Sequence, residues 1–528
     1  MSSLFILIFA GILFCWGYCF YAKRLENLFG VDTNRATPSY SKFDAVDYVP
    51  AKNWLVLFGH HFASIAGAGP IIGPVIAVVM WGWLPALLWV TIGTVFIGGV
   101  HDFGTLIISV KEDGSSVAEI AGRVISRRAR IIFSSFVLLS LILVIAVFGY
   151  LCADTFVKEP KIVLPSLGLI PVAILVGFLL YNLKVKSGLV TVLGMTSLIC
   201  LVIWGNFLPI SANINIWLVV LFLYCYLASI LPVNLLLQPR DYLSALLLFF
   251  GVGIGYLALL LSYPKITMPA FHKFNASEGW LWPTLFVTIA CGAISGFHSL
   301  ISSGTTSKQI ANERHAKRIG YGAMVAEGLV AVLTIISIGV LFKKGEDFSK
   351  AFNTIKPIGL FGSGYGLITK NIFGGYGSFI AITILNAFIL TTLDTATRIS
   401  RYLTEELLNI KNRFFSTGLI VLVSAILAFS GKWNKIWPAF GASNQLVAAL
   451  ALLVVACWLA AKNKSIRIVF WPVCFMLITT VAALLYQAVK YFRSKDITLF
   501  IIVVVLIMLS VIMLREVFSK ILLRRKTD

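Results

Sequence analysis

Long apolar runs separated by short polar segments extend along the whole chain. Fifteen of these runs approach the roughly 20 residues that an α-helix needs to cross a bilayer. The pattern therefore predicts an all-α polytopic membrane protein with about 15 transmembrane helices. The predicted spans are residues 3–22, 54–82, 84–110, 131–157, 166–183, 188–208, 216–237, 242–262, 281–304, 319–342, 375–394, 414–430, 437–461, 468–490 and 497–514.

Composition excludes the main soluble classes. Hydrophobic residues make up 59% of the chain and charged residues 12%, whereas soluble domains carry about 25% charged residues. An aromatic content of 13% also excludes a disordered chain. The net charge of +21 is explained better by membrane topology and anionic lipid headgroups than by nucleic acid. We expect a lipid bilayer and no nucleic acid among the partners.

The distribution of arginine predicts the orientation. If the N-terminus lies outside and the chain crosses fifteen times, every arginine except Arg493 falls on the inner side, as the positive-inside rule requires. The C-terminus is then cytoplasmic. The first run lacks a basic leader and a cleavage site, so we expect a retained helix. The inner stretch 111–130 predicts an amphipathic surface helix, and the glycine-rich outer stretch 343–374 predicts a connector or a hinged lid.

The run 54–82 contains the segment GHHFASIAGAGPIIGP at residues 59–74, with four glycines and two prolines. Proline removes a backbone donor, and such a break survives in a membrane only where protein buries it or where it lines a cavity. Broken helices hold substrates and ions in many secondary transporters. The alternative is a packing notch with a kink. The candidate substrate-binding residues here are Ala66, Gly67, Ala68, Gly69 and Gly73.

A second polar stretch, SGFHSLISSGTTSKQ, occupies residues 295–309. Its spacing places Ser295, His298, Ser302 and Thr305 on one face of a helix. We interpret this face as the lining of a cavity or an ion site, with His298 as a candidate substrate contact. The alternative is a helix whose hydroxyls bond their own backbone carbonyls.

Ionisable residues inside membrane spans are costly, and they are functional candidates by default. Histidine titrates near neutral pH and suits proton coupling. Neighbours on a helix point about 100° apart, so His101 and Asp102 need not touch. The alternative for each group is a structural hydrogen bond or ion pair; Arg240 with Asp241 is expected to form a structural or gating pair. The candidates for proton handling are His60, His61, His101, Asp102 and Glu327.

Amides recur late in the chain, at Asn386, Asn444 and Gln445. Such amides either hold helices together or contact substrate. Four histidines within predicted spans also suggest a haem or metal enzyme as an alternative. Against it, no HExxH motif occurs, and two adjacent histidines at 60–61 cannot face one metal ion from a regular helix. We predict no metal and no cofactor. With no Walker lysine loop, transport would use an ion gradient; a non-concentrative channel or sensor is the alternative from another class.

Five stretches together resemble the carbon starvation (CstA) family of bacterial inner-membrane proteins. They are GHHFASIAGAGPIIGPVIAVVMWGWLPALLW, GGVHDFGTLIISVKEDGSSVAEIAG, LLQPRDYLSA, GAISGFHSLISSGTTSKQI and FGASNQLVAALAL. The resemblance implies uptake of short peptides or of pyruvate during carbon starvation, coupled to protons. It places the chain in a bacterial inner membrane, where the orientation predicted from arginine makes the N-terminus periplasmic.

The resemblance also implies the five-plus-five inverted-repeat fold of the amino acid–polyamine–organocation superfamily. The broken span 54–82 would be the first core helix, 216–237 its inverted partner and 281–304 the eighth. By similarity to sodium-coupled relatives with this fold, Ser302, Ser303, Thr305 and Thr306 would form an ion site. Sodium is therefore the alternative to protons as the coupling ion. The expected divisions are an N-terminal helix and linker (1–53), two repeats (54–208 and 216–394) and additional C-terminal helices (414–528).

Overall fold

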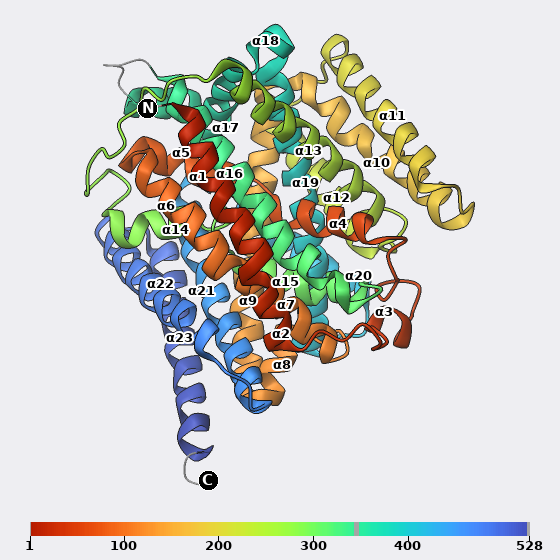
Figure 1. Cartoon of the computed structure of the whole chain (residues 1–528), viewed down its shortest axis with the longest axis vertical. Coiled ribbons are helices and arrows are strands. Elements are labelled where there is room, and N and C mark those ends of the chain that lie inside the picture. Colours follow the sequence, from red (N-terminus) through yellow and green to blue (C-terminus); the bar gives the residue numbers. More distant parts are fainter. Residues whose placement is uncertain (1, 343–347, 525–528) are drawn as a thin grey trace.

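The computed structural model describes residues 2–342 and 348–524, and these residues form a helical bundle without strands. In Figure 1 the long helices run roughly side by side, with α17 at one end of the bundle and α8 at the other. We call these ends the α17 end and the α8 end. The helices up to the middle of the chain are α1 (Ser3–Trp16), α2 (Ala22–Phe29), α3 (Pro38–Ser41), α4 (Trp54–Ala66), α5 (Gly69–Trp81), α6 (Trp83–Gly93), α7 (Gly99–Lys111), α8 (Val117–Val124), α9 (Arg127–Lys158), α10 (Val163–Gly177), α11 (Ser187–Phe207), α12 (Ile214–Ile230) and α13 (Leu237–Ser262).

The second half continues the same architecture. Its helices are α14 (Phe286–Thr288), α15 (Gly296–Gly304), α16 (Gly322–Leu341), α17 (Phe348–Ile368), α18 (Lys370–Phe373), α19 (Gly377–Leu408), α20 (Arg413–Phe429), α21 (Trp433–Ala461), α22 (Arg467–Arg493) and α23 (Ile497–Arg524).

Twelve helical segments among the described residues are long and apolar enough to cross a membrane. Two of the remaining predicted runs, 216–237 and 414–430, correspond to the shorter apolar helices α12 and α20. The last, 281–304, is not one helix. It forms a short helical start at Leu281–Thr288, an unwound segment, and then α15. Every predicted apolar run thus coincides with helical structure, but two of them, 54–82 and 281–304, are interrupted in their middle.

The run 54–82 is broken where its glycines predict. Helix α4 ends at Ala66, Gly67 adopts φ +29° and ψ −153°, and α5 begins at Gly69. The second interrupted run is 281–304. The run 216–237, expected to be the inverted partner of 54–82, forms the continuous helix α12 instead.

The long helices α9 and α19 pack along each other in the centre, and α4 packs along α13. An apolar core runs through all of these helices. The hairpin of α10 and α11 lies at one edge of the bundle, and α22 and α23 lie at the opposite edge (Figure 1). Most functional candidates therefore lie on helices between these two edges.

Two connecting segments differ from the structure that the sequence predicts. The stretch 348–374, predicted to be a connector or a lid, forms α17 and α18, with α17 packed against α5, α16 and α19; residues 343–347 of the predicted stretch lie outside the described residues. The amphipathic stretch 111–130 contributes only α8. A capping box between Ser116 and Glu119 begins this helix by satisfying its first backbone donors. From Arg127 onward the chain already belongs to α9.

Candidate functional site

The first break exposes backbone that neighbouring helices must satisfy. Gly67 has a positive φ, which only glycine adopts without strain, and a methyl group there would lie 2.7 Å from Thr392 Oγ1 of α19. The Thr392 hydroxyl also lies 3.5 Å from the carbonyl of Ser64, and the Ser64 hydroxyl lies 3.1 Å from Thr395 Oγ1. Helix α19 therefore closes the break from one side with hydroxyl groups.

The second break, at residues 289–295, is satisfied by side chains from three other helical segments. Trp89 Nε1 donates to the carbonyl of Ile289 at 3.1 Å, and Thr94 Oγ1 donates to the carbonyl of Gly292 at 3.2 Å. Gln445 Nε2 donates to the carbonyl of Phe286 at 2.5 Å. These bonds explain how an unwound segment persists inside a membrane protein, where each unpaired backbone group would cost several kcal/mol.

An amide from another helix caps the start of α15. Asn444 Oδ1 accepts the backbone N–H of Phe297 at 2.9 Å, and Asn444 Nδ2 donates to Ser295 Oγ at 2.8 Å. Asn444 and Gln445, predicted as substrate contacts or as helix glue, thus both hold the second break in its unwound form. Asn386 does not join them, because its Nδ2 donates to Ser166 Oγ of α10 at 3.0 Å.

The two breaks touch each other directly. A methyl group at Gly69 would lie 2.2 Å from Cys291 Cβ, and one at Gly73 would lie 2.6 Å from the carbonyl of Thr288. No L-residue larger than glycine fits such approaches without movement of the backbone. The candidate residues Ala66, Gly67, Ala68, Gly69 and Gly73 therefore form the crossing point of two interrupted helices.

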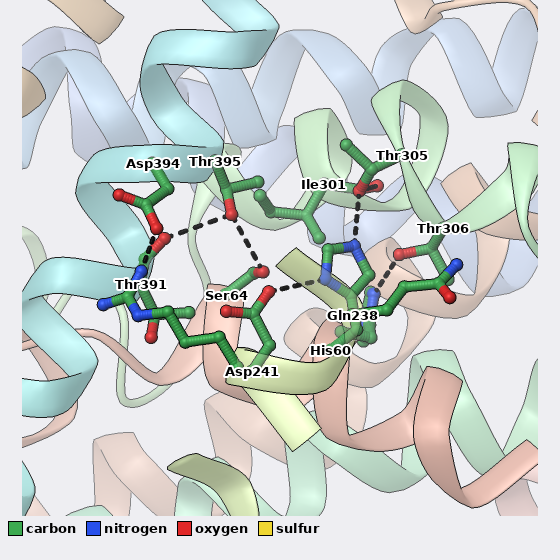
Figure 2. Close-up of polar contacts among 12 residues, drawn as sticks. His60, Ser64, Gln238, Asp241, Ile301, Thr305, Thr306, Thr391, Asp394 and Thr395 are labelled. Atoms are coloured by element: carbon green, nitrogen blue, oxygen red, sulfur yellow. Dashed lines mark hydrogen bonds and ion pairs between the residues drawn. The ribbon is translucent and has the colours of Figure 1, made fainter. Parts of the chain in front are cut away.

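His60 belongs to a first buried network. Its Nδ1 lies 2.6 Å from Asp241 Oδ2 of α13, and its Nε2 lies 3.2 Å from Thr305 Oγ1 and 3.4 Å from Gln309 Nε2. Figure 2 shows Asp241 on one side of the His60 ring and Thr305 on the other. The adjacent His61 points to Thr306, with 2.8 Å between His61 Nδ1 and the hydroxyl. Both histidines thus join α4 to the end of α15.

A second buried network contains the other candidates for proton handling. Asp102 lies 2.7 Å from His101 Nδ1 through one oxygen and 2.9 Å from His298 Nδ1 through the other. The neighbours His101 and Asp102 therefore do touch. The opposite nitrogen of His298 lies 3.2 Å from Glu327 Oε2 of α16. The two atoms are close, but their geometry is not that of a hydrogen bond.

The hydroxyls proposed for sodium are engaged with protein groups. Ser302 Oγ donates to the carbonyl of Asp102 at 3.3 Å, and Ser303 Oγ donates to the carbonyl of Ser299 at 2.8 Å. Thr305 and Thr306 contact the two histidines of α4. Ser295 precedes α15 as its N-cap residue, so it does not share a regular helical face with Ser302 and Thr305.

One cluster differs from the expectation at Arg240. This side chain pairs with Asp394 of α19 instead of the adjacent Asp241, and it donates to Tyr224 Oη of α12 at 2.7 Å. Tyr224 in turn donates to Asp394 at 2.5 Å. Asp394 is the last residue of the predicted span 375–394. Its partner lies 154 residues away, and no local pattern relates the two.

A further ionic cluster closes the α8 end. Arg398 lies 3.1 Å from Asp47 and Arg401 lies 3.6 Å from the same carboxylate, while the ammonium of Lys308 lies over the ring of Tyr402, 4.3 Å from its centroid. Burial raises the pKa of Asp47, but the positive charges of Arg398, Arg401 and Lys308 outweigh this effect and hold the pKa below its usual value.

Two cavities approach the broken helices from opposite ends of the bundle. A cavity of about 550 Å³ near the α17 end reaches Ile76 of α5 and Thr288 of α14. A cavity of about 310 Å³ near the α8 end reaches Ser303 and Gly304 of α15. Within residues 2–342 and 348–524, no group of three or more His, Cys, Asp or Glu side chains could hold a metal ion.

Solved structures support the fold. A manganese transporter from Eremococcus coleocola aligns with a TM-score of 0.58 over 90% of this chain and 99% of its own, at 12% sequence identity. At that identity the similarity concerns the fold alone.

Relatives found by sequence are more similar to this chain than the manganese transporter is. They include "Peptide transporter CstA" of Campylobacter jejuni, 30% identical over 94% of this chain and 82% of the relative. A second is "Peptide transporter CstA" of Escherichia coli, 31% identical over 92% and 81%. A third is "Pyruvate/proton symporter BtsT" of Escherichia coli, 30% identical over 92% and 81%. The profile of the family described as carbon starvation protein CstA matches residues 2–358 and 348–483. The chain therefore belongs to the carbon starvation protein CstA family.

Proposed function

We propose that this protein is a secondary active transporter that takes up short peptides or small carboxylates such as pyruvate together with protons. The observation that carries the proposal is the pair of buried histidine–carboxylate networks beside the two broken helices. The names of the relatives, a peptide transporter and a pyruvate/proton symporter, agree with it. An enzyme is not proposed, because the relatives are named as transporters.

The networks suit reversible proton binding. His60, His101 and His298 each contact a carboxylate and are fully buried. A proton that arrives on His298 or Glu327 neutralises or creates a buried charge, and such a charge in a low-dielectric interior is worth several kcal/mol. Protonation can therefore favour one conformation over another. The hydroxyls at Ser302, Ser303, Thr305 and Thr306 would be the place of a sodium ion in the alternative form of this proposal.

The substrate site is proposed at the crossing of the breaks, at Ala66–Gly73 with His298 nearby. Helix termini exposed by a break carry partial charges, and an N-terminus attracts carboxylates. A cavity at the α17 end reaches Thr288 beside this crossing, and a cavity at the α8 end reaches Ser303 and Gly304 of α15. The two cavities suit a site that opens alternately to either side. Asn444 and Gln445 would hold the second break, and Asn386 would brace α10, instead of contacting substrate.

The fold is proposed to be a five-plus-five inverted repeat, with each half opened by a broken helix. The first half would consist of α4–α5, α6–α7, α9, α12 and α13. The second half would consist of the interrupted run 281–304, α16, α19, α20 and α21, with the hairpin α10–α11 inserted into the first. These halves replace the divisions 54–208 and 216–394, since the second break lies in 281–304.

We further propose fifteen membrane crossings in a bacterial inner membrane, counting α12, α20 and the interrupted run. The α17 end and the N-terminus would face the periplasm, and the α8 end with the C-terminus would face the cytoplasm. The support is the arginine distribution: Arg398 and Arg401 lie at the α8 end.

Uptake into proteoliposomes tests the function. Labelled pyruvate and a labelled dipeptide are each offered under an imposed proton gradient and then under a sodium gradient. We expect one of them to accumulate above equilibrium with the proton gradient alone, and a protonophore to abolish the accumulation. Accumulation with the sodium gradient alone would indicate that the coupling ion is sodium and that it binds at Ser302–Thr306. Equilibration without accumulation would refute active transport and indicate a channel.

A further inference from the structure

The ion pair of Arg240 and Asp394 lies at the meeting point of α12, α13 and α19, next to Asp241 of the first histidine network. Arg240 and Asp394 are fully buried, and Tyr224 is 8% exposed. Arg240 Nη1 and Tyr224 Oη both contact the same atom, Asp394 Oδ2. The whole interaction therefore uses one guanidinium nitrogen and one carboxylate oxygen.

Half of each ionic group is left without a partner. Arg240 Nε and Nη2 and Asp394 Oδ1 are buried and have no hydrogen-bond partner among the described residues. The Nε–Nη2 edge of a guanidinium is a planar fork that fits the two oxygens of a carboxylate. A buried donor without a partner costs roughly 1–3 kcal/mol, and more when it is charged. An unused fork at such depth therefore indicates a ligand with a carboxylate group.

The pair lies beside the first break. Asp394 stands on α19 between Thr392, which contacts Gly67, and Thr395, which contacts Ser64. Figure 2 shows Asp394 and Thr395 next to each other on α19, with Thr395 facing Ser64. The pair thus lies one to two residues along α19 from the hydroxyls that border the proposed substrate site.

We infer that Arg240 binds the carboxylate of the transported substrate through its Nε–Nη2 edge, and that Asp394 carries the coupling proton. The inference rests on the proposed function. When the substrate carboxylate takes the guanidinium, Asp394 loses its counter-charge and binds one proton from the side of entry. When the substrate leaves, the proton leaves Asp394 toward the side of exit and the ion pair forms again. One proton moves with one carboxylate.

The physical reason is that one positive charge cannot compensate two buried carboxylates. An ionised carboxylate left unpaired in a low-dielectric interior takes up a proton instead. The titratable groups that face the pair are Tyr224 and Cys225 of α12, Asp241 of α13 and Cys152 of α9. His60 of α4 is bonded to Asp241, and Arg398 stands four residues after Asp394 on α19. Arg398 is already bound to Asp47 and to the carbonyl of Ala228, so Arg240 remains the cation available to Asp394.

The experiment compares proton-driven accumulation with counterflow exchange in proteoliposomes, because exchange requires no net movement of protons. The variants are Asp394→Asn, Arg240→Lys and the doubly neutral Arg240→Gln/Asp394→Asn. The controls are Arg130→Gln and Glu26→Gln, which remove partly exposed members of the pairs with Glu406 and Lys317. Pyruvate and a dipeptide are compared with pyruvamide and the C-terminally amidated dipeptide, and size-exclusion profiles in detergent check folding.

We expect Asp394→Asn to retain exchange but to lose accumulation about 10- to 100-fold, the range set by loss of a charge-assisted interaction. Arg240→Lys and the double variant should lose both exchange and accumulation. The wild type should transport the acids about 10- to 100-fold better than the amides. The doubly neutral variant contains no unpaired buried charge, so it remains informative if the single variants misfold.

Accumulation at the wild-type level by Asp394→Asn or by the double variant would overturn the inference, and so would equal transport of acid and amide. If the wild type accumulates neither substrate, the proposed function itself fails. That result is distinguishable because it precedes any comparison of variants.

Discussion

Replacement of Gly69 by alanine should damage the crossing of the two broken helices. The new methyl group would lie 2.2 Å from Cys291 Cβ and 2.5 Å from its Sγ, about 1.5 Å closer than carbon atoms in ordinary contact. Both residues lie in the packed interior, so the strain must be relieved by moving one break away from the other. Overpacking of this kind costs about 1–3 kcal/mol.

A double-mutant cycle isolates this contact. Cys291→Gly removes the two atoms that the methyl group meets, so Gly69→Ala/Cys291→Gly should recover at least half of the stability lost by Gly69→Ala. The expected coupling energy is about 1 kcal/mol or more, since the two residues are in direct contact. Unfolding in mixed detergent micelles, followed by tryptophan fluorescence, measures the free energies. Uptake into proteoliposomes shows whether function follows stability.

Gly253→Ala is the matched control. Gly253 lies on α13, and an added methyl group there meets no atom within 4 Å. Alanine in the middle of a helix gains about 0.5–1 kcal/mol over glycine, so this variant should be neutral or more stable. If Gly69→Ala were as stable and as active as Gly253→Ala, the direct contact between the breaks would be refuted.

Three further predictions follow from the other contacts. Asn444→Leu should destabilise the protein by about 1–3 kcal/mol, because the buried N–H of Phe297 loses its acceptor; unfolding equal to wild type would contradict the capping role. His61→Ala should abolish proton-driven accumulation while counterflow persists; accumulation against a gradient would exclude His61 from proton handling. The pKa of Asp47 is lowered in the folded state, so its contribution to stability is present above the unfolded pKa of about 3.9 and disappears as pH falls through the folded value. Wild type should therefore lose stability relative to Asp47→Asn on acidification below about pH 4, and parallel unfolding curves between pH 5 and 3 would contradict this.

The sequence predicted the apolar helices well, because membrane length and the cost of unpaired backbone leave few alternatives. The first break was predictable because Gly67, Gly69 and Pro70 interrupt one run. The second break was not, since residues 289–295 contain one glycine, Gly292, and no proline. That break is held by Trp89, Thr94 and Gln445 of distant segments, and it therefore depends on tertiary contacts.

The candidate site was predicted as a set of residues but not as a set of contacts. A histidine inside a span is visible as costly, so His60 and His298 could be selected. Their partners could not, because His60 meets Asp241 and His298 meets Asp102 across separations of 181 and 196 residues. Arg240 pairs with Asp394 and not with the adjacent Asp241, and this pairing was unpredictable for the same reason: the two residues are far apart in the sequence.

The polar networks occupy only one side of the breaks, and this asymmetry has an electrical consequence. Helices α5, α6 and α14, on the α17 side, contain no ionisable side chain, whereas α4, α7 and α15 on the α8 side carry four histidines. A proton that enters from the α17 end must cross much of the membrane voltage before it reaches a group that can bind it. Each elementary charge that crosses 100 mV gains or loses about 2.3 kcal/mol. The occupancy of the networks should therefore respond to membrane potential as well as to external pH, as in a proton well.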